Sequence, residues 1–312
     1  MPGEAEARGC PALVVRTEGP AVWVDPGDGR EVPCRLRGRL KKRQERVTSL
    51  VVVGDEVAVT LLPDGSGVVE ELRPRRTELA RPGFHGYVHV IAANVDQLVC
   101  VHSARQPDFK RRLVERYLTL ARRAGADALV VVSKCDLERE AVVRSWTAPL
   151  ASAGCEVLLT SAVDGRGLDE LRRRLAGRTS VFAGHSGVGK STLVKALFPG
   201  LELATREVDP KTGKGRHTTS SSRLFRLPEG GYLIDTPGVR ELGLFEDEGA
   251  DEDVARVFPE IEETASACRF RDCSHTVEPG CAVRAAVEAG AIDADRYRSY
   301  LKLQRRGRKK SF

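Results

Sequence analysis

The chain has 312 residues, of which 41% are hydrophobic and 30% are charged, and its formal net charge is +6. This length predicts two or three domains with hydrophobic cores of their own. The apolar runs are strand-sized, well below the ~18 residues that a membrane span needs, and no basic-then-apolar leader opens the chain. We therefore expect a globular, cytoplasmic protein with no membrane contact.

Residues 13–72 alternate short apolar stretches with turn residues. The expected strands cover residues 21–24, 31–36, 50–53, 57–62 and 67–72. Strands at this spacing predict a small β-barrel. A five-stranded OB-fold, which commonly binds oligonucleotides, fits the length, and an SH3-like barrel is the alternative.

Strands and helices alternate after the basic linker at residues 73–76. Leu113, Tyr117 and Leu120 fall at helical spacing. Asp108 is the expected cap of that helix and Gly125 its end. Further strands are expected at 88–92, 96–101, 128–132 and 157–159, with another helix at 168–175. This alternation predicts a parallel sheet covered by helices on both faces.

Two short motifs follow strands of this predicted sheet. Ser133, Lys134, Cys135 and Asp136 follow one strand, and Ser161 and Ala162 follow the next. Ligands of open α/β sheets bind at the carboxyl ends of strands. A carboxylate there accepts from both the ring N–H and the exocyclic amine of guanine, which adenine does not offer. We expect Asp136 to select guanine, the Lys134 stem to cover the base, and the Ala162 N–H to meet the guanine O6.

The motif GxxxxGK[ST] occupies residues 184–191, between an apolar strand at 181–183 and a helix that begins at Lys190. Glycines let the backbone N–H groups wrap a polyphosphate, and the helix adds the positive end of its dipole. Lys190 is expected to reach the β- and γ-phosphates, and the Ser191 hydroxyl to ligate Mg²⁺. The expected contacts are Gly184, His185, Ser186, Gly187, Val188, Gly189, Lys190, Ser191 and Thr192.

Two segments downstream complete a triphosphate site. In the glycine- and cation-rich residues 213–219, Thr218 or Thr219 would complete the Mg²⁺ shell when the γ-phosphate is present, although a plain surface loop is the alternative. In the motif DTPG, Asp235 would hold Mg²⁺ through a water and the Gly238 N–H would sense the γ-phosphate. DTPG and Asp136 favour a GTPase over a P-loop kinase.

These GTPase motifs stand in rotated order, because the guanine-reading residues precede the phosphate loop instead of following it. A circularly permuted domain has its old termini joined and new ones opened elsewhere, which leaves the spatial site intact. The sequence therefore predicts a permuted GTPase domain.

A cluster of potential metal ligands lies near the C-terminus: Cys268, Cys273, His275 and Cys281. Three thiols and one imidazole within fourteen positions predict a closed, structural Zn²⁺ site, against the alternative of a chance group of reduced cysteines. The metal would stabilise a small helical module that contains residues 283–288 and 293–303. The other five cysteines are expected to be ordinary reduced thiols.

Basic side chains gather in two runs. Residues 35–46 carry seven Lys or Arg and one acid, and residues 301–310 carry six and no acid. Either run alone fits a solvated face. Two such runs on either side of a nucleotide site favour an anionic partner, most simply RNA.

With these motifs assembled, the chain resembles the ribosome small subunit-dependent GTPase A family of bacteria over essentially its full length. The resemblance rests on GHSGVGKS, SKCD, TSA, GRHTT, DTPG, the FPE at 258–260 and CxxxxCxHxxxxxC. It implies an OB-fold, a permuted GTPase domain and a zinc domain. It also implies a role in late 30S maturation, with GTP hydrolysis stimulated by that subunit.

Two residues depart from the usual GTPase pattern. Ser133 stands where many GTPases carry asparagine, so we expect fewer hydrogen bonds there than an amide makes. Val239 follows DxxG, where Ras-like enzymes carry a water-positioning glutamine, and a valine cannot orient water. The family resemblance suggests His217 as the substitute.

The sequence thus predicts an OB-fold RNA-binding domain at 1–74, a permuted α/β GTPase domain at 75–246 and a helical zinc domain with a basic tail at 247–312. The catalytic assignments are His217, Lys190, Thr218, Thr219, Asp235 and Gly238. GTP or GDP, Mg²⁺ and one Zn²⁺ are the expected cofactors. The expected partners of this monomer are the small ribosomal subunit with its rRNA and other 30S assembly factors. An RNA-binding ribosome chaperone that holds GTP as a structural ligand is the alternative function.

Overall fold

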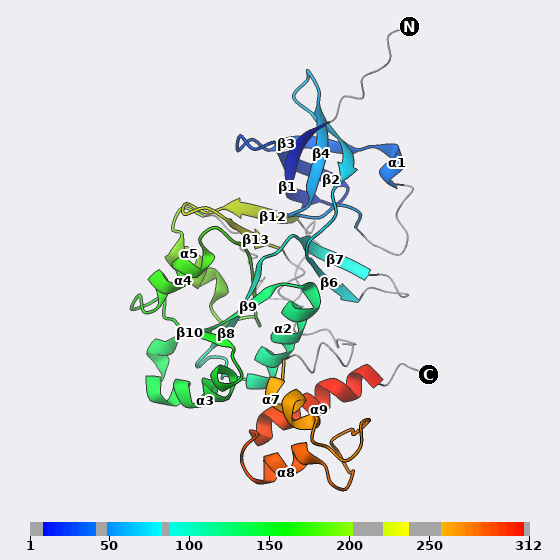
Figure 1. The fold of residues 1–312 in the computed structure, drawn as a ribbon. Helices are drawn as coiled ribbons and strands as arrows, with labels where there is room; N and C mark the ends of the chain where they lie inside the picture. The colour runs from blue at the N-terminus through cyan, green and yellow to red at the C-terminus, as the bar shows by residue number, and fades with distance from the viewer. Residues whose placement is uncertain (1–8, 42–48, 83–87, 202–220, 237–256, 309–312) are drawn as a thin grey trace, which may run out of the picture.

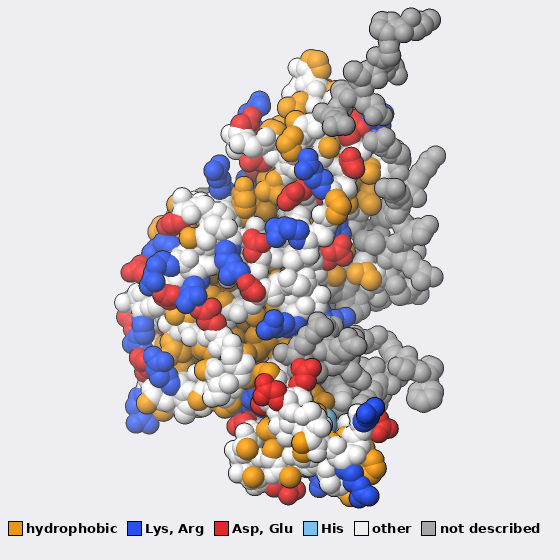
Figure 2. Space-filling model, in the orientation of Figure 1, with side chains coloured by type: hydrophobic (Ala, Val, Ile, Leu, Met, Phe, Trp, Pro, Cys, Tyr) orange, Lys and Arg blue, Asp and Glu red, His pale blue; other side chains and the backbone are white. Residues whose placement is uncertain are grey.

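The computed structural model describes residues 9–41, 49–82, 88–201, 221–236 and 257–308. An N-terminal barrel and a C-terminal helical module lie at opposite ends of the molecule, with an α/β sheet between them (Figure 1). Across the face in Figure 2, acidic and basic side chains are interspersed over the α/β part. Within the described ranges, every helix is too short or too polar to cross a membrane.

The barrel consists of β1 (Cys10–Glu18), β2 (Ala21–Asp25), β3 (Val32–Leu36), α1 (Gly38–Lys41), β4 (Glu56–Leu61) and β5 (Gly67–Leu72). The strands pair in the order β1-β2-β3-β5-β4, and β4 closes onto β1. β3 runs parallel to β5, and the helix lies between β3 and β4 in the chain. This five-stranded closed barrel confirms the OB-fold over the SH3-like alternative.

The strand expected at residues 50–53 is wrong, because this segment is a turn. The Asp55 carboxylate accepts from the Val52 N–H at 2.8 Å, which closes the turn locally. The apolar run packs in three places: Val51 in the barrel core, Val53 in the core on one face of the α/β sheet, and Val52 in a small cluster with Val90 and Ala93. Three valines in sequence therefore fill three different cores.

The predicted linker is partly buried at Arg75, whose side chain is 10% exposed. Its guanidinium donates to both oxygens of the fully buried Asp55, at 2.7 and 2.9 Å, and to the Leu50 carbonyl at 3.0 Å. The linker therefore holds the turn under the barrel through a bidentate ion pair.

The α/β part is a sheet in the order β10-β9-β8-β11-β13-β12. All neighbouring pairs are parallel except β12–β13. The strands are β8 (Gln97–Ser103), β9 (Asp127–Ser133), β10 (Glu156–Leu159), β11 (Thr179–Ala183), β12 (Ser221–Arg226) and β13 (Tyr232–Asp235). A separate hairpin joins β6 (Glu78–Pro82) to β7 (Val88–Ala93).

Helices cover both faces of this sheet, as predicted. Leu98 and Cys100 of β8 pack with residues of α2 (Arg111–Ala124). The intervening Val99 and Val101 pack with α4 (Leu168–Leu175) and α5 (Lys190–Leu197). Alternate side chains of one strand thus enter opposite cores. The described residues of the predicted nucleotide site lie at the carboxyl ends of the strands, beyond the two helix-covered faces.

Of the two predicted ends of α2, the one at Gly125 is confirmed and the one at Asp108 is wrong. Gly125 ends the helix in the left-handed conformation, with φ of 73°. The expected cap at Asp108 is wrong: the helix begins after Lys110, and no side chain of a described residue caps it. The Asp108 carboxylate instead pairs with Arg105 at 3.2 Å.

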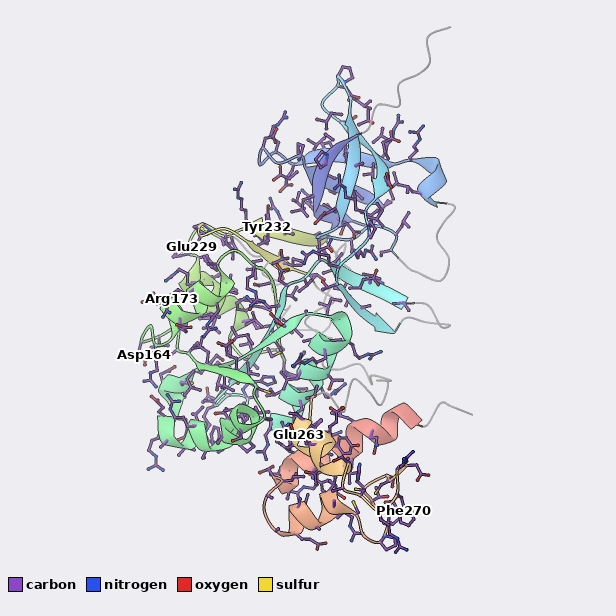
Figure 3. The ribbon with its side chains drawn as sticks, viewed as in Figure 1. Asp164, Arg173, Glu229, Tyr232, Glu263 and Phe270 are labelled. Atoms are coloured by element: carbon purple, nitrogen blue, oxygen red, sulfur yellow. The ribbon has the colours of Figure 1, made fainter. Side chains whose placement is uncertain are left out.

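The barrel and the α/β sheet share hydrogen bonds. β1 pairs antiparallel with β12, with Arg16 opposite Arg223 and Glu18 opposite Ser221, so the described strands form one 11-stranded sheet. Tyr232, at the start of β13, lies near this junction (Figure 3). The β12–β13 hairpin therefore links the barrel directly to the strand that ends at Asp235.

The C-terminal module contains α7 (Pro259–Ala265), α8 (Ala282–Glu288) and α9 (Ala294–Arg308). Arg296 of α9 is 2% exposed and binds Glu260 at 2.6 Å, the Val257 carbonyl at 2.9 Å and Glu115 of α2 at 3.4 Å. Its guanidinium also lies 4.7 Å from the ring centre of Phe258. The FPE motif at 258–260 thus supplies both an aromatic face and a carboxylate to Arg296, which docks the module onto α2.

Replacing Arg296 with methionine should lower the free energy of unfolding by about 3–5 kcal/mol, because Glu260 and Glu115 lose their buried cation. Arg298→Met is the matched control on the same helix, since its pair with Asp295 is exposed to solvent and should contribute little to stability. Denaturant unfolding of the full chain measures both. Equal effects would show that Arg296 does not dock the module.

Burial raises the pKa of Glu115 to about 7, against the partial opposition of Ser299 and Arg296. The folded carboxyl therefore binds its proton more tightly than the unfolded one. Its contribution to stability is complete below the unfolded pKa of about 4.3 and is lost as pH rises towards 7. Glu115→Gln should flatten the fall in unfolding midpoint between pH 5 and pH 8. Glu263→Gln, at an exposed glutamate of α7 (Figure 3), should leave that slope unchanged.

Candidate nucleotide-binding site

The phosphate loop spans residues 184–189, between β11 and α5. A Cβ on Gly184 would lie 2.2 Å from the Val101 carbonyl oxygen, so no other residue fits at the strand exit. Gly189 adopts a φ of 88° as the N-cap of α5. Val188 is buried between them and anchors the loop in the core on the α4–α5 face. The glycines and Val188 therefore fix the course of the backbone at 184–189.

Lys190 lies across this loop. Its ammonium donates to the Gly184 carbonyl at 2.6 Å and to the His185 carbonyl at 2.8 Å. Lys190, Ser191 and Asp235 line one cavity of about 30 Å³. A volume of roughly 10–15 Å³ already holds one water, so this cavity admits a species of that size. β11 and β13 are parallel neighbours, so their carboxyl ends lie side by side. Ser191, which follows the loop after β11, and Asp235, which ends β13, therefore bring two possible metal-ligating oxygens together.

The two predicted guanine-reading segments also meet. The Ser161 hydroxyl donates to Asp136 Oδ1 at 2.7 Å, which fixes the carboxylate. The Cys135 N–H donates to the Thr160 carbonyl at 3.1 Å, and the Thr160 N–H to Val132 at 2.7 Å. The strand end that carries Asp136 is therefore held against the segment that carries Ala162.

Ser133 and Lys134 join these segments to the phosphate loop. The Ser133 hydroxyl lies 2.5 Å from the Val188 carbonyl and 3.1 Å from the carbonyl of His102. The Lys134 ammonium donates to the Gly187 carbonyl at 2.8 Å and to the Gln106 carbonyl. The serine that replaces the usual asparagine thus binds the phosphate loop through its hydroxyl.

A buried histidine that the sequence reasoning missed lies behind the loop. His102 on β8 is 3% exposed, and among the described residues its Nε2 has no hydrogen-bond partner. Burial, with Lys190 nearby, lowers its pKa to about 3. The ring is therefore neutral and adds no charge beneath the phosphate site. His102 lies on β8, whose residues are all buried, and its place near the end of this strand was the one sequence signal that could have pointed to it.

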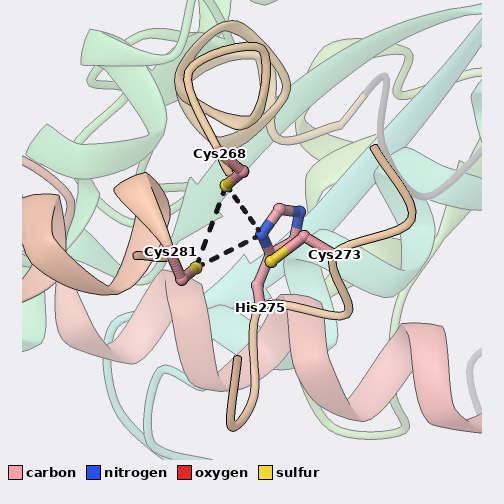
Figure 4. Close-up of side chains that lie close together, drawn as sticks. All are labelled: Cys268, Cys273, His275 and Cys281. Atoms are coloured by element: carbon pink, nitrogen blue, oxygen red, sulfur yellow. Dashed lines mark hydrogen bonds between the residues drawn. The ribbon is translucent and has the colours of Figure 1, made fainter. Parts of the chain in front are cut away.

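The four predicted metal ligands converge in the C-terminal module, with their donor atoms within 4.8 Å of one another (Figure 4). Cys268 Sγ lies 3.9 Å from Cys281 Sγ, and His275 Nδ1 lies 3.6 and 3.5 Å from these two sulfurs. Zn–S bonds of about 2.3 Å and Zn–N bonds of about 2.0–2.1 Å give tetrahedral edges of roughly 3.5–3.8 Å. The donor set therefore fits a tetrahedral zinc ion.

The surrounding chain orients these ligands. Burial raises the pKa of the Cys268 thiol, but N–H donors at Val283 and Ala282 outweigh it, so the pKa lies below its ordinary value. The Tyr297 hydroxyl donates to the His275 carbonyl, and the Glu278 carboxylate accepts from the Ser274 N–H at 2.8 Å. The loop is thus held in shape by contacts outside the four ligands.

A family model described as RsgA GTPase matches residues 72–245. The chain belongs to the RsgA GTPase family. A protein of Chlorobaculum parvum named small ribosomal subunit biogenesis GTPase RsgA is 46% identical over 302 residues, covering 93% of this chain and 96% of its own. A protein of the same name from Gemmatimonas aurantiaca is 43% identical, covering 94% and 95%.

Two solved structures extend the likeness to the fold of almost the whole chain. YjeQ from Thermotoga maritima has a TM-score of 0.76 at 32% identity and covers 95% of this chain and 98% of its own. YloQ, described as a circularly permuted GTPase, has a TM-score of 0.71 at 28% identity and covers 98% of each. The rotated motif order of this RsgA-family chain is therefore a circular permutation, as predicted.

Several predicted residues lie outside the described part of the chain: His217, Thr218, Thr219, Gly238 and Val239. Their roles remain predictions. The structure brings together the other predicted nucleotide contacts, from the SKCD and TSA segments to the phosphate loop and Asp235. Within that set, His185, Ser186 and Thr192 have exposed side chains.

Replacing Ser161 with alanine should weaken GDP binding about tenfold, because Asp136 loses the hydroxyl that holds it. A hydrogen bond to a charged group contributes about 1.5–3 kcal/mol, part of which the freed carboxylate recovers from water. Titration with a fluorescent GDP analogue measures the change. Ser145→Ala is the control, at an exposed hydroxyl of α3 (Glu140–Ser152) that donates to the Val142 carbonyl of the same helix. Unchanged affinity in Ser161→Ala would remove this serine from guanine recognition.

Proposed function

We propose that this RsgA-family chain binds the small ribosomal subunit and acts in late 30S maturation, hydrolysing GTP to GDP and phosphate as a ribosome-stimulated switch. The observation that carries the proposal is that Asp136, Lys190 and Asp235 follow or end β9, β11 and β13, three strands of one parallel sheet, at their carboxyl ends. The relatives named for small ribosomal subunit biogenesis supply the biological partner.

GTP binding follows from the site residues. Asp136, held by Ser161, accepts from the guanine N–H groups, and the Lys134 stem covers the base. Residues 184–189 offer N–H groups to the phosphates, and Lys190 adds a positive charge near the β- and γ-phosphates. Ser191 and Asp235 fit the oxygen donors that Mg²⁺ prefers, and that ion would neutralise charge on the phosphates.

Hydrolysis would be slow without help. Val239 cannot orient the attacking water, and we propose His217 for that role. Unassisted GTPases of this chemistry turn over at roughly 10⁻⁴ to 10⁻² s⁻¹, and a stimulating partner adds ~10³- to 10⁵-fold. A free chain with little activity and a subunit-bound chain with much more would therefore act as a switch. Thr218, Thr219 and Gly238 would respond to the γ-phosphate.

The route to the barrel is the β12–β13 hairpin. Asp235 ends β13, β13 pairs with β12, and β12 pairs with β1 of the barrel. Movement at the γ-phosphate would thus reach the barrel through backbone hydrogen bonds. We propose that the barrel, with the basic runs at 35–46 and 301–310, contacts rRNA, and that the domains divide near residues 74 and 246. A cytoplasmic monomer that meets other 30S assembly factors completes the proposal.

GTP hydrolysis in single turnover, with and without purified 30S subunits, tests the function. We expect stimulation by at least 10³-fold. His217→Ala should lose most of this stimulation and keep its affinity for a fluorescent GDP analogue. An unstimulated wild-type chain would instead make GTP a structural ligand, and full turnover in His217→Ala would leave the water-positioning residue unassigned.

We further propose that Cys268, Cys273, His275 and Cys281 hold one structural Zn²⁺. Elemental analysis of the purified chain should find one zinc per molecule. Cys273→Ser should lose that zinc and lower the unfolding midpoint, because the small module has little core without it. Cys155→Ser, at a cysteine outside the cluster, is the control. Full zinc content in Cys273→Ser would contradict the assignment.

A further inference from the structure

A groove of about 710 Å³ lies between the GTPase helices α2 and α3 and helix α9 of the C-terminal module. No residue of the phosphate loop lines it, and the two basic runs of the sequence contribute only Lys302. Two structural units therefore build its walls. Grooves where two units meet are common binding sites.

The groove carries more positive than negative charge. Six Lys or Arg side chains line it against three carboxylates, Asp108, Asp293 and Asp295. The carboxylates are occupied, since Arg111 binds Asp293 at 3.0 Å and Asp295 at 3.1 Å, and Arg105 binds Asp108. Within the described residues, the ammonium groups of Lys110 and Lys302 make no ion pair, and the buried Nε of Arg112 has no partner. The excess charge is therefore available to an anion.

Flat side chains line the same groove. Phe109 and Trp146 stack with ring centres 6.1 Å apart and an interplanar angle of 13°. The Arg105 guanidinium lies 5.5 Å from the ring centre of Trp146 and is exposed. Nucleic-acid bases stack on aromatic rings and on guanidinium planes alike. An acidic peptide would use the cations but gain little from the stacked rings.

The first turn of α2 also favours an anionic ligand in this groove. Its N-cap is Lys110, and Arg111 and Arg112 follow, with no acidic residue in the turn. Acids are favoured at helix N-termini and cations disfavoured, because the dipole is positive there. Cations at this end therefore add to the dipole instead of balancing it, which suits a phosphate supplied from outside.

We propose that this groove binds a single-stranded RNA segment, with phosphates at Lys110 and Lys302 and a base stacked on the group formed by Trp146 and Arg105. The proposal rests on the proposed function in taking rRNA as the RNA met in the cell. It adds a contact that joins the GTPase sheet to the zinc module, so that one strand of RNA would touch both units.

Trp146 supplies the probe, because the chain has only two tryptophans, Trp23 and Trp146. In the full chain with Trp23→Phe, titration with a uridine octanucleotide should quench Trp146 fluorescence to saturation. Adding Lys110→Glu and Lys302→Glu should weaken binding at least tenfold and reduce the slope of log affinity against log salt by about 1–2. The unassisted GTP hydrolysis of this variant should stay unchanged.

The matched control adds Lys195→Glu and Arg226→Glu instead, which changes the net charge equally at exposed sites outside the groove. Absent quenching, or equal weakening in both double variants, would overturn the proposal. Saturable quenching by a glutamate octapeptide that exceeds quenching by the RNA would replace it with an acidic protein partner. Because no ribosome is present, the result is independent of 30S-stimulated hydrolysis, and either proposal can fail alone.

Discussion

The site depends on the contact between the guanine-reading strand end and the phosphate loop. Ser133 and Lys134, at the carboxyl end of β9, bind the carbonyls of Val188 and Gly187 in a loop that lies more than fifty residues away in sequence. These bonds hold the segment that carries Asp136 against the phosphate loop. Because the contact joins the ends of two strands of one parallel sheet, joining the domain's old termini and opening new ones elsewhere leaves it in place.

The circular permutation determines which structural units are connected to the nucleotide site. The strand that ends at Asp235 is paired through β12 to the barrel, and the C-terminal module follows later in the chain. Arg296 docks that module onto α2 through Glu260 and Glu115. The GTPase sheet, with α2, is thus bonded to one structural unit on each side.

Motif chemistry singled out residues that the structure brings together, because phosphate, guanine and zinc each demand particular donors at particular spacings. The positions of the strand ends, and the end of α2 at Gly125, could be predicted from the local preferences of the residues there. The failures came from tertiary contacts: three valines at 51–53 serve three cores, and Asp108 pairs with Arg105 instead of capping α2. Arg75 was predicted only as part of a linker and Arg296 received no prediction of its own, since nothing local reveals that Asp55 and Glu260 would bind them in buried ion pairs.

The central claim is that Asp136 reads guanine beside the phosphate loop, and base preference in an Asp136→Asn variant tests it most directly. The carboxylate accepts two N–H bonds from guanine, whereas an amide accepts one and donates one, which matches xanthine. Competition binding of GTP and XTP should show a fall in GTP affinity of at least tenfold and a gain in XTP affinity. An unchanged preference for GTP would contradict the assignment of the whole site.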